Sequence, residues 1–300
     1  MIARVLIATL IAALGMFGVA KPVHAEGKLT VGLFAPSAPF PSTAARVELA
    51  NKLGAHLGKA INASGSGRNY ARSGDYAMAV KKGDISVAVV DATYLAVSGG
   101  TYTVLAAAVR GGETSSGWQL VARGGADRIA ALKGKRVLVP SLGGRETDFV
   151  VNALFGGDIA KDYFGKIEAA PDTASTLAAL GLGKADAAIV PTGVTLPSGT
   201  AVVVTLPALP GPVLVAYGTV SVQQRTALAA AAASFAGDST IASFKPIDAD
   251  AVRAIARRFT VPTKRGPHVL PNVRLLVGDL VEGRTFIIER TPATQFAVTR

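Results

Sequence analysis

The residues best suited to hold a small ligand lie in one short segment, 141–148, which reads Ser-Leu-Gly-Gly-Arg-Glu-Thr-Asp and directly follows an apolar run. Gly143 and Gly144 let the backbone approach a ligand closely, because glycine has no side chain in the way. Arg145 can bind a carboxylate or another oxyanion through two parallel hydrogen bonds. We therefore expect this segment to contact an anionic ligand.

Ser141 and Thr147 add two hydroxyl groups to the same segment. Both hydroxyls can donate hydrogen bonds to the oxygen atoms of a ligand. An alternative remains open, in which the segment is a solvated turn and Arg145 pairs with Glu146 or Asp148.

Two further segments carry polar side chains directly after apolar runs. Pro36 and Ser37 follow the first such run, and Asp91, Thr93 and Tyr94 follow a later one. Ligands of open parallel sheets bind outside the carboxyl ends of the strands, where such loops lie. Thr93 and Tyr94 can supply hydroxyls, whereas Asp91 either caps the next helix or binds an amino group of a ligand.

Several kinds of catalytic site are excluded by composition. The chain has no Cys and 3 His, so thiolate catalysis and Cys-ligated or His-rich metal sites are ruled out. A serine hydrolase is a poor alternative, because there is no Gly-x-Ser-x-Gly motif and the Ser-Gly segment 64–67 follows a predicted helix instead of a strand. We expect no metal, no cofactor and no enzymatic activity.

The formal net charge of +11 favours anionic partners. Four basic residues cluster near the C-terminus, but no aromatic residues alternate with them: Arg257, Arg258, Lys264 and Arg265. Such a cluster is typical of a solvated face, so no nucleic-acid partner is expected.

The strands and helices that must position these residues occur in the same order in each half of the chain. The apolar runs 28–35 and 135–139 each end at a Pro-Ser pair, and each half continues to a Gly-closed helix, an Asp and a second apolar run. The pattern predicts two similar strand-helix-helix-strand units. Ser42 or Thr43 is expected to cap the first helix, and Asp172 to cap a helix that begins at Thr173. Alternating strands and helices indicate an α/β protein with mostly parallel sheets flanked by helices.

The halves are joined by two pairs of β-rich runs, 103–110 with 118–123 and 201–206 with 213–217. We interpret these as paired hinge strands, with hinges near 110–120 and 191–213. The predicted division is a first lobe of residues 26–110 and 200–262, a second lobe of residues 111–199, and a C-terminal appendage, 263–300, that forms a hairpin.

The first 25 residues have the pattern of a cleavable export signal. Arg4 precedes an apolar run over 5–20, and Val23-His24-Ala25 fits the small-x-small cleavage site. The apolar run is too short for a membrane span. We expect export to the periplasm; the alternative is a retained anchor.

The export signal, the two-half plan and two segments together resemble a known family. The segments are Gly83-Asp-Ile-Ser-Val-Ala-Val-Val-Asp-Ala-Thr-Tyr94 and Leu132-Lys-Gly-Lys-Arg-Val-Leu-Val139. They are similar to the phosphate/phosphite/phosphonate-binding proteins of ABC transporters. The resemblance implies a type II periplasmic binding protein, in which two α/β lobes are joined by paired hinge strands.

In that family, hydroxyls and backbone N–H groups at a Ser/Thr-rich turn hold the oxyanion. The resemblance places these roles on Ser141 and Thr147, with Tyr94 from the first lobe. Here Gly143-Gly144-Arg145-Glu146 stands where consecutive Ser/Thr and then Gly-Tyr are expected. Either Arg145 compensates for the missing hydroxyls or the ligand is a different anion.

The resulting prediction is a monomeric periplasmic solute-binding protein. It would capture a small oxyanion, such as phosphate, phosphite or a phosphonate, for the permease of an ABC importer. The main alternative is a ligand-sensing receptor domain for a membrane signalling partner.

Overall fold

The computed structural model describes residues 27–218 and 220–260. The predicted export signal and the predicted C-terminal hairpin lie outside these residues. Within the described part of the chain, no helix combines the length and the apolar character that crossing a membrane requires.

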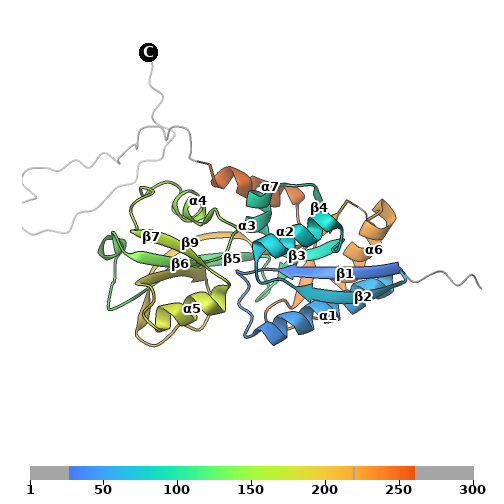
Figure 1. The fold of residues 1–300 in the computed structure, drawn as a ribbon, viewed down its shortest axis with the longest axis horizontal. Coiled ribbons are helices and arrows are strands. Elements are labelled where there is room, and N and C mark those ends of the chain that lie inside the picture. The colour runs from blue at the N-terminus through green and yellow to red at the C-terminus, as the bar shows by residue number, and fades with distance from the viewer. Residues whose placement is uncertain (1–26, 219, 261–300) are drawn as a thin grey trace, which may run out of the picture. The chain divides into compact units, whose positions relative to one another are not determined.

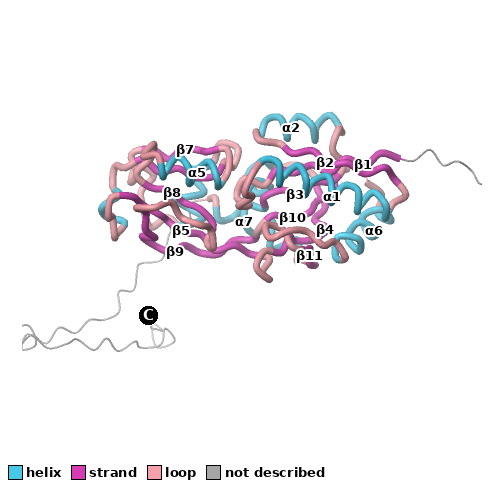
Figure 2. The backbone as a smooth tube through the Cα atoms, turned by 90° about the horizontal axis from the view of Figure 1, so that it is seen from below, coloured by secondary structure: helices cyan, strands magenta, loops and turns pink. Residues whose placement is uncertain are grey.

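The first sheet contains the predicted strands of the first half and the returning C-terminal segment (Figure 1). Its six strands lie in the order β11 (Ser243–Lys245), β4 (Tyr102–Val109), β10 (Pro212–Tyr217), β3 (Val87–Asp91), β1 (Gly27–Phe34) and β2 (Ala63–Asn69). Figure 2 shows these strands side by side in this order. Strands β2, β1 and β3 are parallel to one another, and β10 is antiparallel to β3.

The second sheet has five strands. Their order is β7 (Lys166–Ala170), β6 (Arg136–Pro140), β8 (Ala187–Pro191), β5 (Ser115–Arg123) and β9 (Thr200–Pro210). Strands β7, β6 and β8 are parallel, and β5 is antiparallel to both β8 and β9. Each sheet therefore repeats one plan, a parallel core extended by antiparallel strands.

Helices cover both faces of the first sheet. The clusters of buried side chains place α1 (Thr43–Ala60) and α6 (Val222–Ala233) on one face, and α2 (Ser73–Lys82), α3 (Ala92–Ser98) and α7 (Ala249–Arg258) on the other. Strand residues alternate between the two clusters, as a sheet buried on both faces requires. For example, Val89 belongs to the cluster with α1, and Val90 to the cluster with α2 and α3.

The second sheet is covered in the same way. The helix α5 (Thr173–Gly181) packs on one face, and the short α4 (Glu146–Asp148) leads into a π-helix, Phe149–Leu154, that packs on the other. A short 3-10 helix, Ile129–Leu132, precedes β6. The predicted α/β class, with two sheets flanked by helices, is confirmed, and both sheets are mixed instead of mostly parallel, because antiparallel strands extend each parallel core.

Both predicted helix caps are confirmed. Ser42 Oγ accepts a hydrogen bond from Ala45 N at 3.1 Å, and Asp172 Oδ1 accepts one from Ser175 N at 2.7 Å. These oxygens satisfy N–H groups that have no partner within the first turn of their helices.

The predicted strand-helix-helix-strand plan was wrong in one respect, because each half contains an additional parallel strand. These strands are β2 and β7, which lie at the edges of their sheets. In β2 the sequence Ala-Ser-Gly-Ser-Gly-Arg-Asn has little apolar content, so its pattern does not indicate a strand. Gly65 and Gly67 are required there because a Cβ at either position would collide with the backbone of α1.

The chain passes between the sheets twice. It leaves β4 at Val109 and enters β5 at Ser115, and it returns from β9 to β10 through Gly211, whose N–H donates to Thr114 O at 2.9 Å. Strand β9 pairs with β5 in the second sheet, so residues 200–210, which were predicted in the first lobe, lie in the second. The first lobe is built on the first sheet, and the second lobe is built on the second sheet.

Candidate functional site

The loop after β1 is fixed to the end of β3 by one carboxylate. Ser37 N donates to Asp91 Oδ2 at 2.8 Å, and Ser37 Oγ donates to Asp91 Oδ1 at 2.7 Å. Asp91 is buried, and its side chain makes no capping hydrogen bond to α3. The predicted capping role is therefore wrong, and both carboxylate oxygens are engaged by Ser37.

The environment of Asp91 shifts its protonation equilibrium. Burial raises the pKa of Asp91 to about 6, although the hydrogen bonds from Ser37 and the charge of Arg46 oppose this shift. Burial penalises the charged form, so the carboxyl group takes up a proton more readily than in water.

The same loop contacts the second lobe at the N-terminus of α5. Thr173 N donates to Pro36 O at 3.0 Å, and Thr173 Oγ1 donates to Ser37 O at 2.9 Å. Next to these bonds, Arg46 Nη2 lies 3.0 Å from Asp172 Oδ2, and the Arg46 side chain is only 5% exposed. Pro36 and Ser37 therefore meet residues 172–173 of the second lobe.

Tyr94 meets the loop after β6. Its ring packs edge-on against Phe34, with centroids 4.8 Å apart, and a Cβ at Gly143 would lie 3.0 Å from Tyr94 Cε2. Burial raises the pKa of the Tyr94 hydroxyl. Thr93 is buried, with 3% of its surface exposed. The structure thus brings Tyr94 and segment 141–147 together across the two lobes.

Segment 141–147 forms a tight loop around its own carboxylate. Gly143 and Gly144 have φ of +83° and +104°, which glycine adopts at little cost. Leu142 N and Gly144 N donate to Glu146 Oε1 at 2.9 and 3.2 Å. Two backbone N–H groups of this loop are therefore already hydrogen-bonded to Glu146.

The side chains of this loop point to local partners. Arg145 Nε donates to Asp148 Oδ2 at 2.7 Å, and its guanidinium lies 5.9 Å from the ring centroid of Phe259. This geometry is the alternative left open above, a pair between Arg145 and Asp148. Although burial alone would raise it, hydrogen bonds from Arg145 and Lys161 hold the pKa of Asp148 below its ordinary value. Ser141 and Thr147 are both half-buried.

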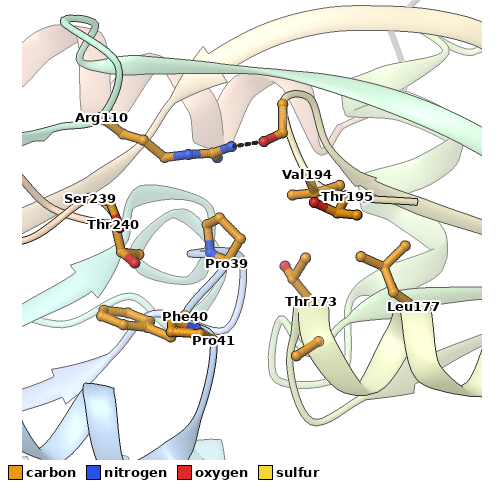
Figure 3. A pocket seen from close by; sticks show the side chains of 12 residues that line it. Pro39, Phe40, Pro41, Arg110, Thr173, Leu177, Val194, Thr195, Ser239 and Thr240 are labelled. Carbon is orange, nitrogen blue, oxygen red and sulfur yellow. Dashed lines mark hydrogen bonds between the residues drawn. The ribbon is translucent and has the colours of Figure 1, made fainter. Parts of the chain in front are cut away.

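A pocket of about 440 Å³ lies where both lobes and the crossing segment meet (Figure 3). It is bordered by the loop after β1, by the N-terminus of α5, which follows β7, and by the loop after β8. These are carboxyl ends of parallel strands in both sheets, the usual location of ligands in open α/β folds. The lining residues are Pro39, Phe40, Pro41, Arg110, Thr173, Ala174, Leu177, Gly193, Val194, Thr195, Ser239 and Thr240.

Arg110 is the one charged residue among those that line this pocket in the described part of the chain. It follows β4, and its Nη2 donates to Thr192 O at 2.7 Å and to Gly193 O at 3.3 Å in the second lobe. Burial lowers the pKa of the Arg110 guanidinium. Sequence reasoning missed this residue, because it reads as the polar end of a strand and its neighbours come from distant segments.

The described histidine has a structural environment. His56 Nε2 lies 2.8 Å from Ala231 O, and its ring packs edge-on against Phe235, with centroids 5.5 Å apart. His268 lies outside the described residues. Within residues 27–218 and 220–260, no three His, Cys, Asp or Glu side chains are placed to hold a metal ion.

Comparison with known proteins identifies the fold. No family model matches the chain, and no curated protein matches it. Among solved structures, the binding protein component of an ABC phosphonate transporter from Pseudomonas aeruginosa is similar, with a TM-score of 0.62 and 13% identity over 78% of this chain and 85% of that chain. PhnD1 from Prochlorococcus marinus in complex with methylphosphonate has a TM-score of 0.61 and 13% identity over 77% and 96%. XAC2383 from Xanthomonas citri bound to ATP has a TM-score of 0.59 and 11% identity over 78% and 97%.

The chain has the two-lobed periplasmic binding protein fold. The sequence-based fold prediction is thereby confirmed. At 11–13% identity the likeness concerns the fold, and two of these solved structures carry different ligands, ATP and methylphosphonate.

Proposed function

We propose that this chain is a periplasmic solute-binding protein that holds a small anionic ligand between its lobes and delivers it to the permease of an ABC importer. The observation that carries the proposal is the pocket at the carboxyl ends of strands from both sheets, with Arg110 as its only lining charge among the described residues. Its volume of about 440 Å³ lies in the usual range for sites of small molecules.

The manner in which the lobes are joined supports a closing motion. Two crossing segments connect them, and short polar contacts such as Thr173 with Pro36 and Arg110 with Thr192 add to these connections. Hinge motion about such paired segments is the usual way in which binding proteins close on a ligand. Export by the first 25 residues, a monomeric state and delivery to a permease belong to the same proposal.

A phosphonate or phosphate ligand is the finer form of the proposal. Two of the similar solved structures have names that refer to phosphonate transport or methylphosphonate. The sequence predicted that such a ligand contacts Pro36, Ser37, Asp91, Thr93, Tyr94, Ser141, Gly143, Gly144, Arg145 and Thr147. None of these ten residues lines the pocket of about 440 Å³, and Asp91 and Thr93 are buried, so this form needs contacts outside that pocket. Because Glu146 accepts from Leu142 N and Gly144 N, an oxyanion could use these donors only after displacing that carboxylate.

The proposal is tested by thermal unfolding of the mature protein with phosphate, phosphite, methylphosphonate, alkyl sulfonates and carboxylates. A ligand at 100 times its dissociation constant stabilises the folded state by about 2.7 kcal/mol. We expect at least one anion to raise the melting temperature without being chemically altered. If every anion leaves it unchanged, or if an anion is converted to a product, the proposal is wrong.

A further inference from the structure

The pocket between the lobes has two chemically different ends. In Figure 3 the Arg110 guanidinium lies at one end, and Phe40 and Pro41 lie at the other. Phe40 is 2% exposed and the Arg46 guanidinium lies 5.3 Å from its ring centroid, so Pro41 provides most of the surface there. Leu177 and Val194 supply aliphatic surface from the second lobe.

At the polar end, part of the Arg110 guanidinium makes no hydrogen bond to the described residues. Nη2 of Arg110 donates to Thr192 O and Gly193 O, whereas Nε and Nη1 have no hydrogen-bond partner within the described residues. No acidic residue lines the pocket within this part of the chain. The backbone of Glu113 is hydrogen-bonded to that of Arg110, but within the described residues the Arg110 guanidinium forms no ion pair. A half-buried guanidinium that makes no ion pair is suited to a carboxylate or sulfonate of a ligand, which it can bind through charge-assisted hydrogen bonds.

Hydroxyl groups line the same pocket. Thr195, Ser239 and Thr240 line the pocket from both lobes. Hydroxyls can donate to the remaining lone pairs of an oxyanion, so that a charged head group would be satisfied after it leaves water.

The other end favours an apolar body. Removing apolar ligand surface from water stabilises a complex, and an inorganic anion has no such surface to offer. We therefore infer that Arg110 determines ligand class, and that this pocket takes a small organic monoanion with one charged head and an apolar body. This inference rests on the proposed function and names the ligand class of that site.

The test is titration calorimetry with matched probes of equal length: hexanoate, hexanamide and hexylamine, with acetate, phosphate and methylphosphonate alongside. Hexanoate should bind at least about tenfold more tightly than hexanamide, because hydrogen bonds to charged groups are the stronger ones. Acetate should bind more weakly than hexanoate, and hexylamine should not bind.

Arg110→Gln should abolish the preference for hexanoate over hexanamide, a readout that a purely structural role of Arg110 would not change. Arg128→Gln, at a side chain that is 79% exposed, is the control and should keep the preference. A second pair of variants does not depend on Arg110. Leu177→Trp should block the apolar end of the pocket, whereas Leu182→Trp, at a residue 73% exposed beside the same helix, should not.

The outcomes separate this inference from the proposed function. Equal binding of hexanoate and hexanamide, or a preference that survives Arg110→Gln in a folded variant, would overturn the inference. Binding of phosphate or methylphosphonate alone would also overturn it while supporting the proposed function. If no anion binds at all, both fail.

Discussion

At the scale of single residues, two carboxylates accept hydrogen bonds from the protein itself. Both lie in segments where the sequence suggested contact with a ligand. Asp91 accepts both hydrogen bonds of Ser37, and Glu146 accepts two backbone N–H groups of its own loop. Each carboxylate holds a loop at the carboxyl end of a strand in a fixed shape. Such side chains position a site even where they do not touch the ligand.

Asp91 should make stability depend on pH. Its pKa is raised from 3.8 to about 6 on folding, so between these values the folded state binds more protons than the unfolded state, and stability falls as pH rises. The contribution is present below pH 3.8 and is lost as pH rises through about 6. One pKa unit corresponds to about 1.4 kcal/mol, so the loss is on the order of 3 kcal/mol.

Urea unfolding of the wild type and of Asp91→Asn at several pH values measures this effect. The wild type should lose stability relative to the variant between pH 4 and pH 6 or slightly above. A difference between the two proteins that stays constant across this range would contradict the assignment.

Glu146 should stabilise the loop through its acceptor oxygen. Glu146→Ala removes the acceptor of Leu142 N and Gly144 N, so we expect the free energy of unfolding to fall by about 1 kcal/mol. Glu146→Gln keeps an acceptor oxygen and should lose less. Glu48→Ala, at an exposed position of α1, is the control for thermal unfolding. Equal losses for the Ala and Gln variants would show that the acceptor is not what stabilises the loop.

At the scale of elements, the contact between α1 and β2 depends on glycine on both sides. Gly54 and Gly58 of the helix face Gly65 and Gly67 of the strand, and a Cβ at Gly58 would lie 2.7 Å from the backbone of Gly65. The backbones of the helix and the strand approach one another more closely than side chains permit.

Gly67→Ala should therefore destabilise the protein by about 1–3 kcal/mol, because an added methyl group in a filled contact forces the backbone to shift. Gly74→Ala is the matched control, since no atom lies within 4 Å of a Cβ at that position of α2. Chemical denaturation compares the two variants. If both variants unfold at the same denaturant concentration, the contact has room that its geometry does not suggest.

Elements whose signals are local are predicted from the sequence, and elements that depend on distant contacts are not. Periodic apolar residues and caps predict α1 and α5, because Ser42 and Asp172 act within their own helices. Strand β2 is not predicted, because its glycines are required by the close contact with helix α1 and have low strand propensity. Arg110 escapes prediction because its role depends on residues 192–193, which only the fold brings near.

At the scale of the whole described molecule, the lobes are held together by both apolar and polar contacts. One cluster of buried side chains continues from the first sheet into the second, through residues such as Tyr94 and Phe149. The polar contacts at its edge connect carbonyl groups of the first lobe to Thr173 of the second. Because polar contacts can be exchanged for water at little net cost, they are the contacts that opening would break first.

Thr173→Val should weaken this closure without changing the cores. It removes the hydroxyl that donates to Ser37 O and Pro36 O and leaves the Thr173 N–H bond in place. A single hydrogen bond contributes about 0.5–1.5 kcal/mol, so amide hydrogen exchange in segments 35–41 and 171–174 should become roughly threefold to tenfold faster. Thr176→Val is the control, because that hydroxyl donates to Asp172 O within its own helix. Unchanged exchange in Thr173→Val, or equal acceleration in both variants, would mean that this contact does not hold the lobes closed, and that closure depends on the shared apolar cluster.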